Sequence, residues 1–558
     1  MTARIRRPGK GAGVANLAIA LAVLAVLLPL ILHAATAAPP TAAEFSPNAR
    51  QVIRKAPPGQ AASVNGTGKG NGDGGGAAST TLPTKSVPRN QVKRCVGPPP
   101  LRQIDDPQSP PCIAYWSGDN GGATATGVTK DAVYIAIPTP ENKKSQYDAL
   151  FKFFNNRFQF YGRQMIPEFC NSSGGGSGSD QQNEQVADAA LAAAGCGGMP
   201  KPFASQFYRQ VNGAYYMPQM ACRYHTIVVG SYSPYDSKFL NRCAPYQYQY
   251  PMETDEEFAN VGEWICGRFA GGRKAQWSDS PDAPRKFAIL LETFTDDDPG
   301  SRLDALNPMQ DKLRACGVDI PAKDVIVNPV PNAFDAASAQ NAMLQLRRDN
   351  ITSVICMCNF FSFGTLQRAA TTSAYHPEWL TSTFGLNDVN SSFTLGAGTP
   401  DQMRHTFGVT FQPRIVKPLT NVYNVALEEG DPSVAPDTTS LVEGELEIYR
   451  GLFLLATGIQ MAGPKLTVET FRDGLRKTVF PNPLTPAHAG FVGFRPDGYS
   501  MTNDAAEWWW STNDVGPFSD SRAKRGTVCY LDGGNRHSLG NWPKGDAPFF
   551  QEPCDSGA

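Results

Sequence analysis

Hydrophobic residues in the middle of the chain form two kinds of segment that alternate. Short runs rich in Val, Ile and Leu are bounded by proline, glycine or polar residues, and they occupy 131–140, 225–231, 286–293, 324–330 and 352–358. Longer segments with apolar positions three or four apart come between them, as at 145–160, 303–315 and 336–348. Continuous apolar strands that alternate with helices are typical of parallel sheets covered on both faces. The pattern therefore predicts an α/β fold.

The number of these units predicts two lobes. One doubly wound sheet usually needs fewer strands, and further strands are expected at 378–385 and 405–411, with late helices at 441–461 and 468–477. We divide the chain into a first Rossmann-like lobe and a second one with the same kind of parallel sheet. The first lobe takes 127–255 and 379–430, and the second takes 256–378 and 431–490.

The C-terminal part, 491–558, has a different pattern. The sequence GFVGFRPDGYSMTNDAAEWWW alternates with a period of two around a Pro-Asp-Gly turn, which predicts a β-hairpin. Within it, Trp508 and Trp510 share one strand face and Trp509 takes the other. The block could bind a ring-shaped ligand or face a partner. We favour a third interpretation, in which it packs the hairpin onto a lobe.

The N-terminal part carries a targeting pattern. Four basic residues come before 11–43, which has no charged residue, and 17–32 is an apolar run that precedes the small-residue site Ala35-Thr36-Ala37. This pattern predicts a secretory signal peptide over 1–37, with an uncleaved N-terminal membrane anchor as the alternative. We therefore expect an exported protein, extracellular or in the cell envelope. Residues 38–126 are expected to form a disordered Pro/Gly-rich linker and a loop-rich lead-in.

Composition narrows the choice of function. Lys and Arg total 50 against 51 Asp and Glu, and the basic residues are scattered, so no nucleic-acid partner is expected. The chain has no H-E-x-x-H, no G-x-S-x-G and no P-loop. No two of its six histidines lie within four residues of each other, so no local zinc pair is formed. We therefore assign no catalytic residue, no metal and no cofactor, and we expect a protein that is not an enzyme.

Twelve cysteines follow the N-terminal segment, and export makes disulfides the default interpretation. Spacing suggests four local bridges: Cys95–Cys112, Cys170–Cys196, Cys222–Cys243 and Cys529–Cys554. Cys356 and Cys358 remain, with Cys266 and Cys316. In an extended strand Cys356 and Cys358 point to one face about 6.5–7 Å apart, too far for a mutual disulfide. We expect each either to be a buried apolar residue or to bridge to Cys266 or Cys316.

Four segments then appear in an order that a known family shares: GVTKDAVYIAIPTP (127–140), FFNNRFQFYGRQM (153–165), VVGSYSP (228–234) and AYHPEWLTST (374–383). From about 127 to 510 the chain resembles type I periplasmic solute-binding proteins of ABC transporters, in the branched-chain amino acid (Leu/Ile/Val) class and an actinobacterial form. The resemblance implies two lobes joined by a three-strand hinge, and an early first-lobe disulfide that Cys170 and Cys196 could form. We expect a monomer. SQFYRQVNGAYYMPQ (205–219) departs from the family's Gly-rich loop.

In open α/β sheets ligands bind at the carboxyl ends of strands, where helix N-termini present free N–H groups. The candidate ligand-binding residues lie at these predicted ends: Thr139, Ser205, Phe207, Ser231, Tyr232, Ser233, Thr293, Phe294 and Asn359. The resemblance implies that a hydroxyl such as that of Ser231 holds a ligand carboxylate; a strand-end turn serine is the alternative. Glu292 or one of the acids in TDDDPG (295–300) could pair with a ligand ammonium. For TDDDPG itself we favour a helix cap and solvated loop.

Together these observations predict an exported protein that captures a small solute, an amino acid or an amide-like compound, between two lobes. It would present the solute to the membrane permease of an ABC transporter. Two alternatives stay open. One is a membrane-tethered module that senses a ligand for a signalling partner, and the other is an exported enzyme on the same scaffold.

Overall fold

The computed structural model describes residues 95–556 except 140–142, 172–180, 207–212, 231–234, 293–298, 329–333, 385–387, 389–398, 415, 438–441, 483–489 and 517–525. The predicted signal peptide, with its possible anchor, and residues 38–94 lie outside this part of the chain. Within it, no helix combines the length and the apolar character that crossing a membrane requires.

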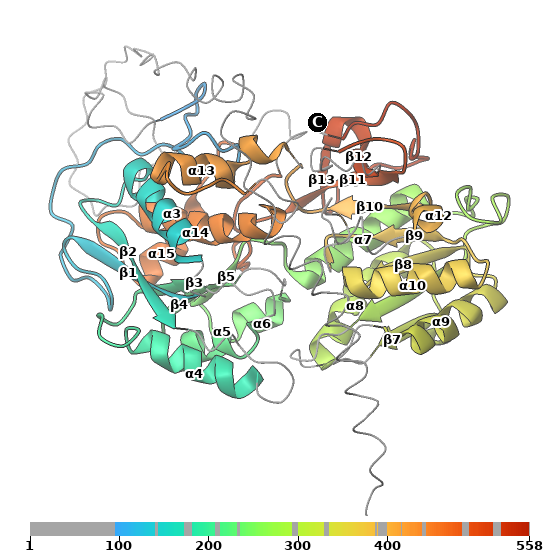
Figure 1. Cartoon of the computed structure of the whole chain (residues 1–558), viewed down its shortest axis with the longest axis horizontal. Coiled ribbons are helices and arrows are strands. Elements are labelled where there is room, and N and C mark those ends of the chain that lie inside the picture. Colours follow the sequence, from blue (N-terminus) through green and yellow to red (C-terminus); the bar gives the residue numbers. More distant parts are fainter. Residues whose placement is uncertain are drawn as a thin grey trace, which may run out of the picture. The chain divides into compact units, whose positions relative to one another are not determined.

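The first sheet is parallel throughout and has the order β2-β1-β3-β4-β5. Its strands are β1 (Ala132–Thr139), β2 (Gln164–Asn171), β3 (Ala204–Gln206), β4 (Ile227–Gly230) and β5 (Gln247–Gln249). Both faces are covered, as Figure 1 shows. One face carries α3 (Lys144–Arg157), α13 (Val422–Gly430), α14 (Val442–Ala462) and α15 (Val468–Lys477). The other carries α4 (Gln181–Ala193) and the short α5 (Tyr216–Pro218), which continues into a π-helical turn.

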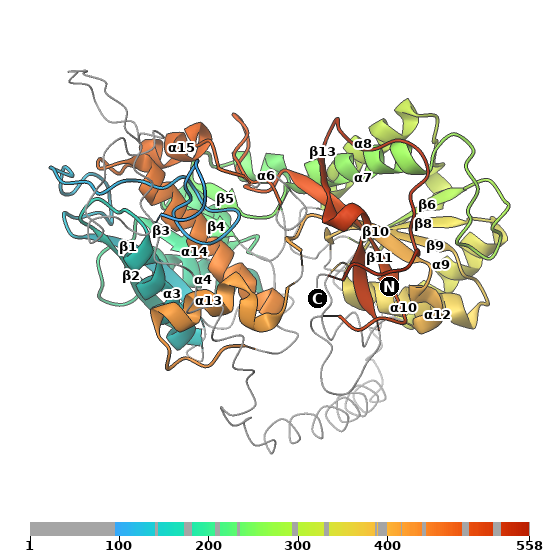
Figure 2. The same ribbon diagram turned by 90° about the horizontal axis from the view of Figure 1, so that it is seen from above.

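The second sheet has the order β12-β11-β10-β9-β8-β6-β7, with β13 paired to β11. Its parallel part contains β6 (Phe287–Glu292), β7 (Val325–Asn328), β8 (Ser353–Met357), β9 (Glu378–Thr381) and β10 (Thr406–Thr410). Its antiparallel part contains β11 (Asp504–Ser511), β12 (Thr527–Tyr530) and β13 (Arg536–Ser538). One face packs against α7 (Thr254–Arg268) and α8 (Pro299–Ala315), and the other against α9 (Ala336–Arg348) and α10 (Phe360–Thr372) (Figure 2).

The structure confirms the predicted α/β class with two parallel-sheet lobes. Among the described elements, the chain passes from one lobe to the other between β5 and α7, between β10 and α13, and again between α15 and β11. The first and third of these crossings are joined, because Gln249 and Ser500 form a parallel bridge and Gln249 N donates to Tyr499 O at 3.0 Å.

The division of the late elements between the lobes was wrong. We expected 379–430 in the first lobe and 431–490 in the second, but β9 pairs with β8 and β10 with β9 in the second sheet. Conversely, α14 packs on β3 and β4 of the first sheet, and α15 packs on α14. The physical reason is the short connection after α10. It lets the chain return as a parallel strand beside the strand it has just left, the usual course of a β-α-β unit.

The tryptophan block belongs to the core of the second lobe. Trp508 and Trp510 pack with the face of the sheet that α9 and α10 cover, and Trp509 packs on the face of α7 and α8. All three side chains are buried. The expected turn is present as an antiparallel bridge between Val492 and Thr502, while β11 pairs with β10, β12 and β13.

The lead-in from Cys95 packs on the first lobe. Asp106 is buried and accepts hydrogen bonds from Arg450 Nη1 at 2.7 Å and from the Tyr449 hydroxyl at 2.9 Å, both on α14. Gln108 accepts from the hydroxyl of Tyr250 at 2.7 Å. Residues 95–126, expected to be loop-rich, contain no helix or strand, but they contribute buried polar groups to the fold.

The structure contains a disulfide at each of the four cysteine pairs that spacing suggested. The interpretation of the remaining four cysteines was wrong. Cys266 is bonded to Cys316, and Cys356 is bonded to Cys358. The prediction extends the strand through Cys358, but β8 ends at Met357 and Cys358 lies in a bend. The two Cα atoms consequently lie 5.3 Å apart, within the range that a disulfide spans.

Candidate ligand-binding site

Most of the candidate residues of the first lobe lie outside the described residues. These are Phe207, Ser231, Tyr232 and Ser233. Thr139 is the last residue of β1. Ser205 lies in β3 with its side chain fully buried, and its hydroxyl donates to Ala136 O at 3.0 Å and lies 2.7 Å from the Tyr216 hydroxyl. In this structure the Ser205 hydroxyl is therefore engaged inside the lobe, and its role toward a ligand stays a prediction.

In the second lobe, Asn359 lies between β8, from which Cys358 separates it, and α10, of which it is the N-cap. Its side-chain oxygen accepts from the backbone N–H groups of Phe361 and Ser362, both at 2.9 Å. This is the usual role of an N-cap asparagine, which satisfies N–H groups that have no partner inside the helix. Thr293 and Phe294, the other two candidates in this lobe, lie outside the described residues.

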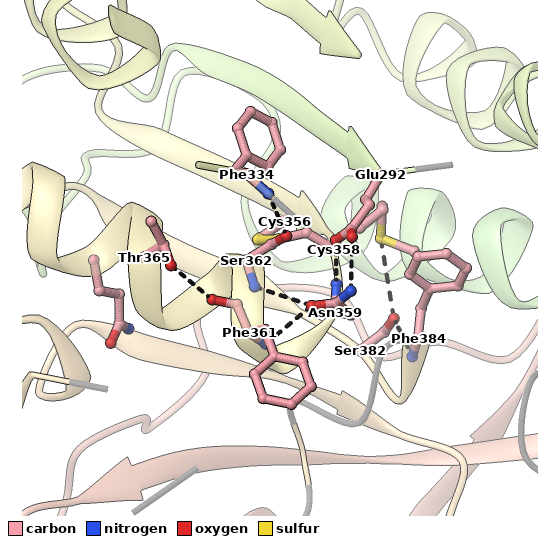
Figure 3. The surroundings of a disulfide bond; sticks show 12 residues. Glu292, Phe334, Cys356, Cys358, Asn359, Phe361, Ser362, Thr365, Ser382 and Phe384 are labelled. Atoms are coloured by element: carbon pink, nitrogen blue, oxygen red, sulfur yellow. Dashed lines mark hydrogen bonds between the residues drawn. A yellow bond between two sulfur atoms is a disulfide. The ribbon is translucent and has the colours of Figure 1, made fainter. Parts of the chain in front are cut away.

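Glu292, at the end of β6, is held by the same asparagine. Asn359 donates its side-chain amide to Glu292 Oε1 at 2.6 Å and its backbone N–H to Oε2 at 2.9 Å. Figure 3 shows the Asn359 amide between the Glu292 carboxylate and the first turn of α10. The Glu292 side chain is 1% exposed. A buried carboxylate needs such donors, and the N-terminus of a helix is a favourable place for a negative charge.

Two further contacts connect neighbouring strand ends to this point. Ser362, in the first turn of α10, accepts from Phe334 N at 3.0 Å and so holds the segment that enters α9. Ser382, just after β9, donates its hydroxyl to Glu257 Oε1 at 2.7 Å, and Phe384 N donates to the same oxygen at 2.7 Å. We call Glu292, Asn359, Ser362 and Ser382 the strand-end cluster. Its hydrogen bonds join the carboxyl ends of β6 and β8 to the first turn of α10, while Ser382 joins the end of β9 to Glu257 of α7.

An exposed aromatic side chain lies beside the strand-end cluster. Phe361 is 55% exposed at the first turn of α10, and its ring centre lies 4.1 Å from that of Phe360. Small-molecule sites are concave and are lined mainly by hydrophobic and aromatic side chains with a few placed polar groups, so Phe361 is a candidate to contact a ligand at this edge. The apolar pattern could not identify Phe361, because an exposed phenylalanine and a core phenylalanine look alike in sequence.

Sequence reasoning also missed Glu257 and Ser382. Glu257 lies in the first turn of α7, where acidic residues are common and usually solvated. Its burial and its two donors arise only when α7 packs against the end of β9. Ser382 gives no local signal, because a serine after a strand is normally interpreted as a turn residue.

Among the described residues, one group has the spacing of a metal site: Asp514, Cys529 and Cys554. Cys529 and Cys554 are bonded to each other, so neither supplies a thiolate, and a lone carboxylate does not hold a metal.

Titratable groups between the lobes have shifted pKa values. Burial raises the pKa of Glu256, in the first turn of α7, to about 8, and raises that of Glu253 as well. Arg495, from the third crossing, pairs with both carboxylates and opposes these shifts. The junction between the lobes therefore holds two carboxyl groups whose pKa values burial raises, both paired with one arginine.

A scan against family models finds none that matches, and a search of curated proteins finds no relative. Solved structures give likenesses at low identity. A fatty acid ABC transporter substrate-binding protein from Thermomonospora curvata is 14% identical, with a TM-score of 0.46, covering 76% of this chain and 96% of its own. An ABC transporter substrate-binding protein from Desulfitobacterium hafniense in complex with Leu is 13% identical, with a TM-score of 0.41. The match covers 73% of this chain and 99% of that protein.

A third solved structure is a solute-binding protein of an ABC transporter from Rhodopseudomonas palustris HaA2 in complex with p-hydroxybenzoic acid. It is 10% identical, with a TM-score of 0.48, and covers 69% of this chain and 94% of its own. At this level of similarity we draw no conclusion about ligand or function from any of the three.

Proposed function

We propose that this chain is an exported solute-binding protein. It captures a small molecule, an amino acid or an amide-like compound, between its two lobes and delivers it to the membrane permease of an ABC transporter. The observation that carries the proposal is the strand-end cluster, which fixes polar groups at the carboxyl edge of a parallel sheet, beside the exposed ring of Phe361. Ligands of open α/β sheets bind at this edge.

The connection between the lobes supports the same function. Three crossings allow one lobe to move relative to the other without unfolding either sheet. Binding that contacts both lobes would then shift the population toward a closed form. Capture and release need no covalent chemistry, in agreement with the absence of a catalytic motif in the sequence.

The test is to identify the ligand directly. Native mass spectrometry of protein purified from its own host should show a stoichiometric small molecule, and the free amino acids and their amides should include at least one that raises the melting temperature. A protein that carries no ligand and responds to no member of this panel would contradict the proposal. Turnover of a panel member would favour an enzyme instead.

A further inference from the structure

The Cys356–Cys358 disulfide closes a ring over a single residue, Met357, at the end of β8. Cys356 is fixed inside the sheet, because it is in register with Leu290 of β6 and with Thr381 of β9. Cys358 lies beyond the last strand residue, and both cysteine side chains are fully buried against α9 and α10. The bridge therefore fixes the direction in which the chain leaves the sheet.

This bridge is the least able of the six to stabilise the fold as a whole. A disulfide restricts the unfolded chain more when it closes a longer loop. Cys356 and Cys358 are 2 residues apart in sequence, while Cys266 and Cys316 are 50 apart. We therefore expect the Cys356–Cys358 disulfide to act locally, on the conformation of the folded state, and not on global stability.

The bend after β8 sets the position of Asn359. The residue directly after Cys358 makes four hydrogen bonds of the strand-end cluster, two to the Glu292 carboxylate and two to the first turn of α10. All four require one orientation of the Asn359 backbone and side chain. Figure 3 shows the disulfide at the end of β8, next to Asn359 and the first turn of α10.

We propose that the Cys356–Cys358 disulfide is a positioning element for the ligand-binding edge of the second lobe. It holds Asn359, and through it Glu292 and the first turn of α10, in the bound-state geometry before the ligand arrives. Such preorganisation raises affinity because less freedom is lost on binding. Its effect on affinity rests on the proposed function, whereas its effect on the order of Asn359 does not.

Two double variants, each lacking one disulfide, separate a local effect of the bridge from an effect on global stability. Cys356→Ala/Cys358→Ala removes the positioning bridge and keeps the buried surroundings apolar, and Cys266→Ala/Cys316→Ala is the matched control. In the first variant, hydrogen exchange at the amides of Asn359, Phe361 and Ser362 should accelerate by about ten-fold, as expected for the loss of an ordered cap. The control should lower the melting temperature more and leave these amides protected.

A double-mutant cycle tests whether the bridge acts through Asn359. In the Asn359→Ala background, removal of Cys356–Cys358 should change exchange at Phe361 and Ser362 by much less than it does in the wild type, because the cap is already lost. Additive effects would show that the bridge acts elsewhere and would overturn the proposal. If the alanine pair does not fold, Cys356→Val/Cys358→Ala fills more of the buried space and replaces it.

The affinity arm uses the best-binding member of the panel of free amino acids and their amides, measured by calorimetry. Cys356→Ala/Cys358→Ala should bind it about ten-fold more weakly, and Cys266→Ala/Cys316→Ala should bind it as the wild type does. If no panel member binds the wild type, the proposed function fails while the exchange result still decides the positioning role. Unchanged exchange at all three amides overturns the positioning role whatever the affinities are.

Discussion

Arg495 lies between the buried carboxyl groups of Glu253, the N-cap of α7, and Glu256, in the first turn of α7, and so joins the third crossing to the first. Its Nη1 is 2.8 Å from Glu256 Oε2, at ion-pair distance but not aligned as a hydrogen bond, and its Nη2 pairs with Glu253. Glu253 also accepts from Tyr499 N at 2.9 Å. One guanidinium thus serves two carboxyls. With Asp255 and Asp497 nearby, the pKa of Glu256 rises to about 8, mainly through burial.

The Glu256→Gln variant should therefore change how stability depends on pH. The folded-state pKa of about 8 lies above the ordinary value of 4.5, so the folded state binds the proton of Glu256 more tightly than the unfolded state. The resulting contribution to the free energy of unfolding is complete below about pH 4.5 and is lost as the pH rises to 8. Replacing it by the neutral amide should raise the free energy of unfolding at pH 8.5 by about 1–3 kcal/mol and change it little at pH 5. Urea unfolding at the two pH values measures this.

Glu263→Gln is the control for this experiment, because Glu263 lies on the same helix and pairs with the partly exposed Lys312 at 3.0 Å. Its effect should be small and should not increase with pH. An equal free-energy change at pH 5 and pH 8.5 in Glu256→Gln would contradict the assignment of a proton to Glu256.

The Asp106→Ala variant tests whether the lead-in is part of the first lobe. It leaves the buried guanidinium of Arg450 without its carboxylate, and removing one partner of a buried ion pair typically costs about 3–5 kcal/mol. We expect a loss of this size in urea unfolding. Asp105→Ala, at the exposed neighbouring position, should be nearly neutral. Equal effects of the two variants would mean that Asp106 and Arg450 do not depend on each other.

The hydrophobic pattern predicted both sheets because strands buried on two faces leave a local signal. It also predicted a strand before Asn359 and a helix after it, although β8 ends at Met357, one residue earlier than expected. The role of Asn359 toward a ligand stays a prediction. It could not assign β9 and β10 to a sheet. Strand pairing is a contact between distant segments, and the apolar runs of the two lobes are alike.

The sequence could not predict which side chains contact each other, for a similar reason. The contact between Glu292 and Asn359 joins residues 67 positions apart, and nothing local distinguishes Glu292 from a solvated acid. The Cys356–Cys358 bridge was missed because we took the strand geometry one residue too far. A bend at Cys358 is enough to change an unbridgeable pair into a disulfide.

Glu168 in β2 is a buried acid that, unlike Glu292 or Asp106, has no hydrogen-bond partner for its carboxylate among the described residues. Its side chain is 1% exposed, and neither carboxylate oxygen has a hydrogen-bond partner in the described part of the chain. Burial raises its pKa to about 7 from 4.5, so its contribution to stability is lost as the pH rises from about 4.5 to 7. Glu168→Leu should stabilise the fold by about 1–3 kcal/mol at pH 8, and by less at pH 5, where the carboxyl is already neutral.

Glu378→Leu is the matched control, since Glu378 is equally buried in a strand but pairs with Arg285 Nε at 2.8 Å and Nη2 at 2.9 Å. Removing Glu378 leaves Arg285 buried and unpaired, so this variant should lose about 3–5 kcal/mol. Urea unfolding of both variants at pH 5 and pH 8 gives the comparison. A destabilised Glu168→Leu at pH 8 would mean that Glu168 has a partner that its burial in β2 does not suggest.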